Sequence, residues 1–167
     1  CPVTANGTSS NPIKLTPANS DKTVTFGKNT ATTTTILNYV TFEYGSTILM
    51  YGNSNSKITN CTFTTNAQFV TNGEVKNCNF QKIWNNGAAK ISYCNISDIF
   101  RAYNSNTPYN INYCNFTLIG SGIKFEQMTS GNVDATNNWW GTTNSTTIQS
   151  YIRDAGSLVN YSPYATS

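Results

Sequence analysis

The sequence predicts an all-β fold, a right-handed parallel β-helix in which successive coils stack into a solenoid of about six to eight coils. Two observations predict it: a short internal repeat, and like residues at equivalent positions of that repeat. Six segments align without gaps, starting 21, 17, 16, 20 and 22 residues apart: LNYVTF from Leu37, ITNCTF from Ile58, VKNCNF from Val75, ISYCNI from Ile91, INYCNF from Ile111 and VDATNN from Val133. A near-constant period with variable intervening segments is what one solenoid coil per repeat produces.

The columns of this alignment predict the core. The first position is aliphatic in all segments, the fourth is Cys in four of them, and the sixth is Phe in four of them. Coils of a parallel β-helix stack at about 4.8 Å, so each column becomes a ladder of like side chains. We expect the aliphatic, Cys and Phe ladders to face inward. An amphipathic helix is excluded because the apolar positions lack a 3.6-residue period.

The third position of the repeat predicts a bend. Strict alternation would put positions one and three on one face of the strand and positions four and six on the other. All three apolar columns can therefore face inward only if the strand bends between positions one and four. The third position holds Tyr39, Asn60, Asn77, Tyr93, Tyr113 and Ala135. Because Asn tolerates bends and hydrogen-bonds along a stack, Asn60 and Asn77 are expected to form a short ladder.

The remaining segments complete a single domain over residues 1–167. An apolar patch after each repeat predicts the next strand of each coil, at 48–50, 69–70, 83–84, 99–100 and 123–125. Residues 1–36 form looser N-terminal coils, residues 37–138 form the regular coils, and residues 139–167 form a C-terminal cap. In this cap Trp139 and Trp140 cover the open end of the solenoid, and the apolar pattern from Ile148 to Ile152 predicts a short helix at about 146–154.

Three stretches of the chain carry a family resemblance. They read GTSSNPIKLT from Gly7, then ILNYVTFEYG, and finally VDATNNWWGTTNSTTIQSYIRDAGSLVNYSPY. Together they resemble exported right-handed parallel β-helix proteins of the pectate-lyase-like superfamily, of the non-catalytic surface-protein type with an Asn-Asn-Trp-Trp-Gly cap. The resemblance covers nearly the whole chain and implies the fold. It leaves the function open, because the superfamily hosts lyases, hydrolases, adhesins and structural coats.

The composition is typical of a protein of the cell exterior. Only 10% of the residues are charged, aromatic residues reach 13%, and ten tyrosines accompany many Asn, Ser and Thr residues. The net charge of +3 is not clustered, which argues against a nucleic-acid partner. The apolar runs are too short for a transmembrane segment. We expect an extracellular or cell-surface location and, because the chain begins at Cys1, a processed N-terminus.

No catalytic constellation is expected. The chain has no His and seven acids, which fall in different columns of the repeat, whereas the resemblance implies acidic clusters along one face for the enzymes of this fold. Arg101 and Glu126, one coil apart with Asp98 nearby, come closest to a site, and an exposed ion pair accounts for them. The cysteines have neither a CxxC spacing nor a His partner. The sequence thus predicts no catalytic residue, no metal and no cofactor.

The cysteines leave two interpretations open. Cys61, Cys78, Cys94 and Cys114 lie in neighbouring coils, at a spacing within the Cα range of disulfides, which allows the pairs Cys61–Cys78 and Cys94–Cys114. Buried thiols that act as small hydrophobic side chains fit equally well. Cys1 lies outside this ladder and is a candidate lipid-anchor site, a candidate partner for an intermolecular disulfide, or simply the first residue of the chain.

Two further sets of residues are candidate sites. Six sequons supply candidate glycan acceptors: Asn6, Asn60, Asn95, Asn115, Asn144 and Asn160. Five aromatic side chains are candidate platforms for stacking of sugar rings: Tyr44, Tyr51, Trp84, Tyr103 and Tyr109.

These observations favour a non-catalytic structural or adhesive protein of the cell surface. Its partners would be further copies of itself, in a coat, sheath or filament, or a cell-surface polymer or polysaccharide. An outward column of Thr and Asn offers hydrogen bonds to such a partner: Thr41, Thr62, Asn79, Asn95 and Asn115. The polar residues 1–12 leave the first coil open to a partner strand. The alternatives are a carbohydrate-binding module and a remnant polysaccharide lyase.

Overall fold

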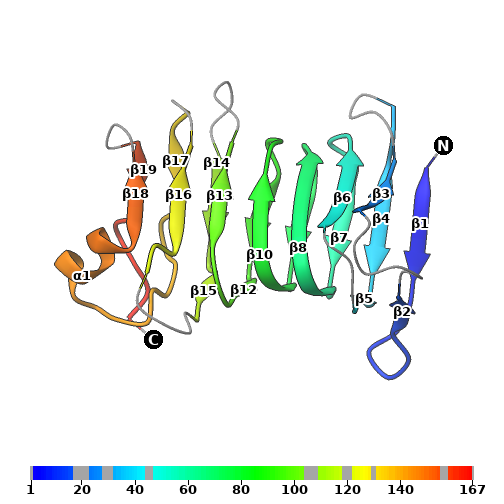
Figure 1. Cartoon of the computed structure of the whole chain (residues 1–167), viewed down its shortest axis with the longest axis horizontal. Helices are drawn as coiled ribbons and strands as arrows, with labels where there is room; N and C mark the ends of the chain where they lie inside the picture. The colour runs from blue at the N-terminus through cyan, green and yellow to red at the C-terminus, as the bar shows by residue number, and fades with distance from the viewer. Residues whose placement is uncertain are drawn as a thin grey trace.

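The computed structural model describes residues 2–16, 23–27, 32–43, 47–103, 109–117, 122–128, 131–154 and 158–166. These residues form an all-β parallel solenoid of about 5 turns, with one short helix, so the expected fold class is confirmed. The strands lie side by side along the long axis of the molecule, from the N-terminal to the C-terminal end (Figure 1). The number of turns is slightly smaller than the six to eight that the sequence predicts.

An 8-stranded sheet runs along one side of the solenoid. Its strands, in spatial order, are β1 (Val3–Asn6), β4 (Thr35–Asn38), β7 (Lys57–Thr59), β9 (Glu74–Lys76), β11 (Lys90–Ser92), β14 (Tyr109–Asn112), β17 (Val133–Asp134) and β19 (Val159–Asn160). Neighbouring strands are parallel, and the repeats are in register, with Leu37 beside Ile58 and Ile58 beside Val75. The first position of the repeat therefore forms the aliphatic ladder that the sequence predicts.

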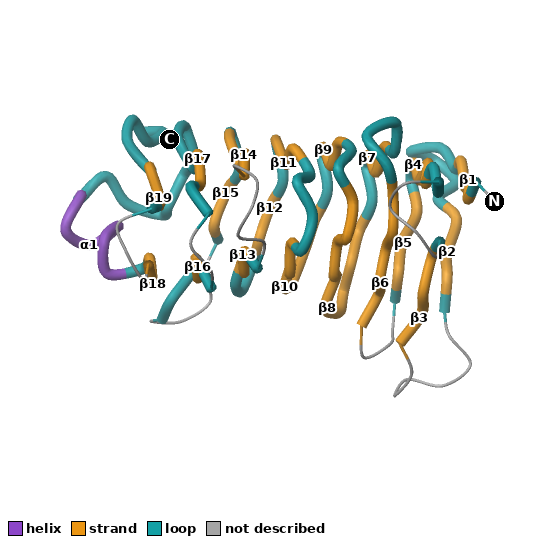
Figure 2. The backbone as a smooth tube through the Cα atoms, turned by 90° about the horizontal axis from the view of Figure 1, so that it is seen from above, coloured by secondary structure: helices purple, strands orange, loops and turns teal. Residues whose placement is uncertain are grey.

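An 11-stranded sheet forms the remainder of the coils. Its main path runs through β18 (Ile152–Asp154), β16 (Phe125–Gln127), β13 (Phe100–Ala102), β10 (Asn79–Asn85), β8 (Thr62–Thr71), β5 (Val40–Phe42) and β2 (Ile13–Leu15). Off this path lie β3 (Thr23–Phe26), β6 (Thr47–Gly52), β12 (Asn95–Ile96) and β15 (Asn115–Phe116). Strands β2 and β3 lie within residues 1–36, where the sequence predicts looser N-terminal coils. Seen from above, the two sheets line opposite sides of the solenoid and enclose its core (Figure 2).

The bend at the third position of the repeat is confirmed by the backbone. Tyr39, Asn60, Asn77, Tyr93 and Tyr113 have φ angles of 51–57°, in the left-handed region that non-glycine residues seldom adopt. This turn lets positions one, four and six all point inward, as shown by the buried Leu37, Val40 and Phe42. The Asn ladder also forms, since Asn77 Nδ2 donates to Asn60 Oδ1 at 3.4 Å and Asn60 Nδ2 donates to Asn38 Oδ1 at 2.9 Å.

The sixth position forms a stacked aromatic column inside the solenoid. The ring centroids of Phe42 and Phe63 lie 4.7 Å apart with 10° between their planes, and those of Phe63 and Phe80 lie 4.8 Å apart with 12°. Such offset-parallel pairs add to the stabilisation from burial. Ile96 interrupts the column, which resumes at Phe116. The inward Phe ladder is therefore confirmed.

The final repeat is displaced by two residues from the expected alignment. Tyr109, not Ile111, pairs with Val133, which puts Ala135 beside Ile111. The bend accordingly falls at Asn137, with φ 59°, instead of at Ala135. Asn138, instead of Thr136, takes the Cys position, where its Oδ1 accepts from Cys114 N at 2.8 Å. The expected match of Val133 to Ile111 in the aliphatic column was therefore wrong. Ala135 takes that position and Asn138 takes the Cys position, and both side chains are buried.

The C-terminal end carries a shorter helix than expected. Helix α1 (Ser145–Ser150) begins after Asn144, whose Oδ1 accepts from Thr147 N, and buries Ile148. Ile152 does not belong to this helix. It lies in strand β18, where it pairs with Phe125 of β16 and so supplies backbone partners to the edge of the 11-stranded sheet. The helix lies beyond β18 at the end of the solenoid (Figure 1). Trp140 stacks on Phe116 as the last rung of the aromatic column, with centroids 4.4 Å apart.

Candidate functional site

The outer face of the 8-stranded sheet contains the candidate functional site. A shallow open groove of about 820 Å³ crosses strands β7, β9, β11 and β14. Most of the residues that line it have polar side chains: Ser54, Ser56, Lys57, Asn72, Gly73, Glu74, Lys90, Ile91, Ser92, Tyr93, Asn110, Asn112 and Tyr113. Since successive side chains of a strand point to opposite faces, the aliphatic ladder faces the core while its neighbours in each strand face this groove.

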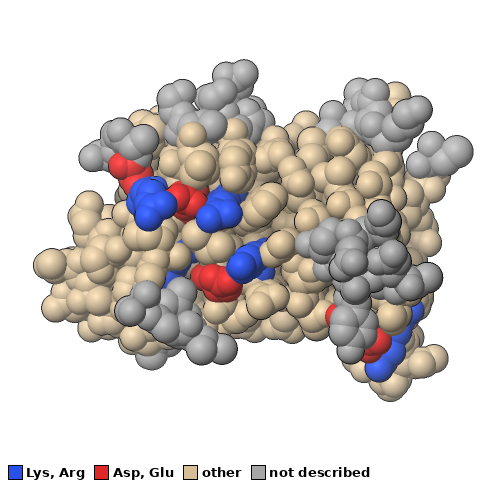
Figure 3. Space-filling view, viewed as in Figure 1, with Lys and Arg blue, Asp and Glu red and all other residues tan. Residues whose placement is uncertain are grey.

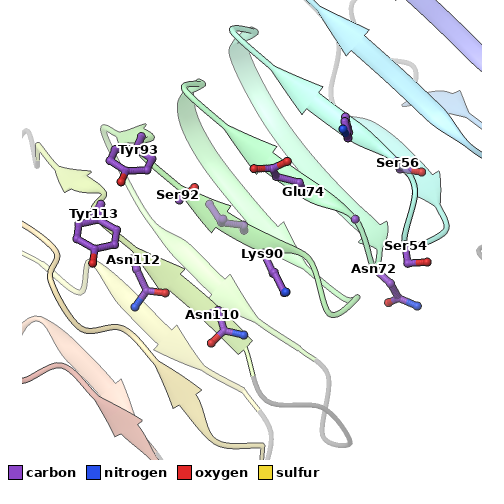
Figure 4. Close-up of a pocket in the computed structure, with 13 residues that line it drawn as sticks. Ser54, Ser56, Asn72, Glu74, Lys90, Ser92, Tyr93, Asn110, Asn112 and Tyr113 are labelled. Carbon is purple, nitrogen blue, oxygen red and sulfur yellow. The ribbon is translucent and has the colours of Figure 1, made fainter.

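Two stacked tyrosines form the most exposed apolar surface of the groove. Tyr93 and Tyr113 are 53% and 55% exposed, and they are the two exposed aromatic side chains among the residues that the structure describes. Their ring centroids lie 5.2 Å apart with 9° between the planes. Each follows directly after a groove strand, at the bend with positive φ, which turns both side chains outward in register. Figure 4 shows the two rings on neighbouring turns, on the same side as Ser92 and Asn112.

The environment of the tyrosine pair determines what it can bind. The Lys76 ammonium lies 5.2 Å from the centroid of the Tyr93 ring, a cation–π contact on this pair. Because the rings also face one another, they present hydroxyls and ring edges to solvent more than open faces. The flanking polar side chains Ser92, Asn110 and Asn112 supply donors and acceptors. This arrangement can hydrogen-bond to hydroxyl groups and contact apolar C–H groups at the same place.

Charges alternate along the groove. Lys57, Glu74 and Lys90 occupy equivalent positions of three neighbouring strands. The two lysines and the glutamate leave this column with a net charge of +1. Because Glu74 separates the two lysines, this column offers no continuous run of positive charge that a polyanion could follow.

No protein-family model, curated protein or solved structure matches this chain. The solenoid fold therefore rests on the structure, and the resemblance to the pectate-lyase-like superfamily stays a resemblance. Within the described ranges, no three Cys, Asp or Glu side chains gather so that they could hold a metal ion. In the same residues, no helix is long and apolar enough to cross a membrane.

The aromatic residues chosen from the sequence lie elsewhere, and one choice was wrong. Tyr109 is only 1% exposed, and its hydroxyl donates to the Asn85 carbonyl at 3.1 Å, so it cannot stack on a sugar. Its inward direction follows from its place two residues before Ile111 in the same strand. Trp84 and Tyr103 lie in the 11-stranded sheet region, half-buried, with centroids 6.1 Å apart and planes tilted by 55°. Tyr51 is half-buried in β6, and Tyr44 lies outside the described residues.

The acidic residues considered for catalysis form ion pairs. Arg101 Nε donates to Glu126 Oε2 at 2.7 Å, and Arg153 Nη1 donates to Glu126 Oε1 at 2.6 Å. Burial alone would raise the pKa of Glu126, but the two guanidinium groups outweigh it and lower that pKa below its ordinary value. Asp98 instead pairs with Lys82 at 3.3 Å. On the face shown in Figure 3, charged side chains of both signs accordingly lie together in small groups.

The cysteine ladder is buried. Cys61, Cys78, Cys94 and Cys114 are free thiols in this structure. The amides of Cys61 and Cys78 each donate to the sulfur of the next cysteine at 3.4 Å. Burial raises the pKa of the Cys78 and Cys114 thiols well above the ordinary value, which makes them poor nucleophiles. Disulfide pairing under oxidising conditions stays a prediction, and Cys1 lies outside the described residues.

The six sequons differ in accessibility. Asn6, Asn95, Asn144 and Asn160 are exposed, whereas Asn60 and Asn115 are half-buried. The Asn95 amide already donates to Asn79 Oδ1 at 2.8 Å within the outward Thr and Asn column, whose register is confirmed. The Nδ2 atoms of Asn60 and Asn95, to which a glycan would be attached, donate in these ladders, whereas Asn6 and Asn160 accept hydrogen bonds at their Oδ1 atoms and are the less encumbered acceptors.

Proposed function

We propose that this protein is a non-catalytic, adhesive solenoid of the cell exterior that binds a neutral, hydroxyl-rich polymer along the outer face of its 8-stranded sheet. The observation that carries the proposal is the exposed, in-register pair Tyr93 and Tyr113 at the edge of a polar groove. Exposed aromatic residues beside amide and hydroxyl groups are a surface that suits sugars, because tyrosine offers an apolar edge and a polar tip together. A polysaccharide is the polymer of this chemistry.

The repeat of the solenoid supports a polymer as the ligand. Neighbouring turns present polar side chains at equivalent positions, such as Ser92 beside Asn112 and Lys90 beside Asn110. A chain lying along the solenoid axis would meet such groups at each turn. Weak contacts repeated along one ligand add up to firm attachment, as in multivalent binding.

The composition and the resemblance support the location and the absence of catalysis. A charge-poor, Asn- and Thr-rich surface is typical of exported proteins, and the sequence resembles non-catalytic surface proteins with the same fold. Glu126, the acid with the closest basic neighbours, is 6% exposed and held between two guanidinium groups. We therefore expect no turnover of polygalacturonate in the presence of calcium. Turnover that Arg101→Ala abolishes would establish the remnant-lyase alternative instead.

The test of polymer binding is a pull-down with insoluble polysaccharides and a glycan array. The double variant Tyr93→Ser, Tyr113→Ser is expected to bind at least about tenfold more weakly, a loss of about 1.4 kcal/mol. The matched control is Tyr103→Ser in the other sheet, which should bind like the unaltered chain. Full binding by the double variant, with its circular dichroism spectrum unchanged, would overturn the proposal. Loss of binding in Tyr103→Ser alone would move the site to Trp84 and Tyr103.

Self-association is a second candidate function. One observation at the N-terminal end of the solenoid favours it. An apolar hollow of about 210 Å³ opens there among Leu15, Val24, Phe26, Phe42 and Ile48. Among the described strands, β1 and β2 also end their sheet paths, and such edges are where further strands add. Sedimentation with and without reductant tests this candidate. A strict monomer in both conditions that still binds glycans would leave polymer binding as the sole proposal.

A further inference from the structure

Tyr93 and Tyr113 also have the geometry of an oxidative cross-linking site. They belong to neighbouring turns and follow strands β11 and β14, in which Ile91 pairs with Ile111 and Ser92 pairs with Asn112. Their rings lie nearly parallel with centroids 5.2 Å apart. More than half of each side chain is exposed, so an oxidant in solution reaches both. Each phenol thus has a second, equally accessible phenol held beside it.

We propose that these two residues form an intramolecular dityrosine bond when a haem peroxidase and hydrogen peroxide act on the protein. Each phenol gives up one electron and its phenolic proton and becomes a phenoxyl radical. The two radicals join through one new C–C bond between ring carbons ortho to the oxygens. The two ortho hydrogens then move to the oxygens, which restores both phenols. One hydrogen peroxide accepts the two electrons and two protons and leaves as two waters.

The structure explains why this pair reacts with itself. Exposed side chains can turn about χ1 and χ2, so that the ortho carbons of two rings at this separation can meet. The bend at positive φ holds the two backbones at the spacing of neighbouring strands, about 4.8 Å, which keeps the partner near while the first radical exists. The resulting bond would join two turns of the solenoid covalently on the face that carries the groove. The inference does not depend on polymer binding.

Other described tyrosines are worse placed. The Tyr109 ring is buried, and its hydroxyl is bonded to a carbonyl. Tyr161 and Tyr164 are half-buried, and their hydroxyls donate to Gln149 Oε1 at 3.0 Å and to the Thr143 carbonyl at 2.9 Å. Tyr103 has Trp84 as its ring neighbour instead of a second phenol. The proposal therefore names one pair.

The experiment treats a dilute solution of the 167-residue chain with a haem peroxidase and hydrogen peroxide. We expect dityrosine fluorescence from a monomer whose mass is lower by two hydrogen atoms, and a digest in which the Tyr93 and Tyr113 peptides are joined. Tyr93→Phe and Tyr113→Phe keep a stacked ring but cannot form the phenoxyl radical, so each should abolish the signal. Tyr103→Phe is the control and should keep it.

Three outcomes would overturn the inference. The first is a cross-linked monomer from Tyr93→Phe, and the second is a digest that joins two other tyrosines. The third is formation of covalent dimers with no cross-linked monomer, which would show that the rings meet those of other molecules instead of each other. Binding of the Phe variants to the polysaccharide, measured in parallel, keeps this result separate from the proposed function.

Discussion

The aromatic column of the solenoid ends differently at its two extremes. At the C-terminal end Trp140 is fully buried and stacks on Phe116 with 1° between the ring planes. At the N-terminal end Phe42 pairs in register with Leu15 and meets Phe26 edge-on at 5.5 Å, and both neighbours are only half-buried. The same repeat thus provides a dense last rung and a looser first one. Side chains near the C-terminal end should therefore contribute more to stability.

Polar contacts strengthen the same contrast. Lys124 Nζ donates to the carbonyls of Phe116 and Trp140, at 3.2 and 2.6 Å, which satisfies backbone acceptors beside the last ring. Asn138 Nδ2 donates to the Ile111 and Ala135 carbonyls, at 2.7 and 2.6 Å. Buried backbone groups that lack partners would be costly, so these two side chains allow the core to close.

The largest expected effect is that of Trp140→Ala. Removing a fully buried aromatic ring leaves a cavity against Phe116, and such truncations cost about 3–5 kcal/mol. We expect a loss near the upper end of this range in urea unfolding followed by fluorescence and circular dichroism. Trp139→Ala is the matched control, because Trp139 is half-buried, and it should cost less. Equal losses would mean that the last rung is not packed more densely than its surroundings.

Phe80→Ala tests the middle of the column. Phe80 is 3% exposed, stacks on Phe63 and meets Phe69 edge-on at 5.6 Å. The expected loss is again about 3–5 kcal/mol, by the same cavity argument. Ile96 lies next in the column, so repacking towards it can lower the loss relative to Trp140→Ala. A change within the error of the unfolding measurement would place the column outside the core.

Phe26→Ala should have a smaller effect at the N-terminal end. Because Phe26 is half-buried, its truncation removes only part of the burial free energy, and we expect a loss of about 1–2 kcal/mol. The midpoint of urea unfolding measures this loss. Phe42→Ala is the comparison, because Phe42 is fully buried and lies on the next turn. A loss as large as that of Phe42→Ala would show that the N-terminal end of the solenoid is packed as tightly as the C-terminal end.

The sequence predicted the regular turns well because their columns repeat side-chain chemistry that the stacking requires. The bend at Asn60 and Tyr93 and the inward Phe ladder both follow from the alignment. The last rung did not follow, because Val133 matches the aliphatic column better than the small Ala135 that occupies it. The pairing of Tyr109 with Val133 and the bend at Asn137 reveal the shift.

The candidate site was less predictable than the fold. The sequence placed Tyr93 and Tyr113 at a bend, but a bend residue can point inward, outward or along the stack. Both tyrosines lie in the third column of the alignment, which could have indicated a stacked pair. Their exposure, in contrast, depends on the positive φ of the bend, which the sequence alone does not give. The prediction that Tyr109 is an exposed stacking platform was wrong, because the identity of a single aromatic residue does not indicate which face of the strand it occupies. The partner Arg153 of Glu126 was also missed, since it was expected within the C-terminal helix.

The smallest expected effect concerns the ion pairs near the two ends. Glu126 links three C-terminal turns through Arg101 and Arg153, whereas Glu43 pairs with Lys14 at 3.0 Å near the N-terminal end, where Lys14 is 66% exposed. Burial raises the pKa of Glu126, but its two Arg partners lower it overall, and hydrogen bonds from Lys14 and Thr16 lower that of Glu43.

A lowered folded-state pKa means that the stabilisation is complete above the unfolded pKa of about 4.3 and is lost as the pH falls through the folded value. Glu126→Gln should therefore destabilise the protein at pH 7, by about 1 kcal/mol or less because Arg153 is largely exposed. The difference from the unaltered chain should shrink as the pH falls from about 4.3 through the lowered folded-state pKa of Glu126, below which both side chains are neutral. Urea unfolding at several pH values measures this, with Glu43→Gln as the exposed counterpart expected to change stability less. A difference that stays constant from neutral to acidic pH would show that Glu126 acts through packing, and the C-terminal turns would then owe their stability to Trp140 and Asn138 without the ion pairs.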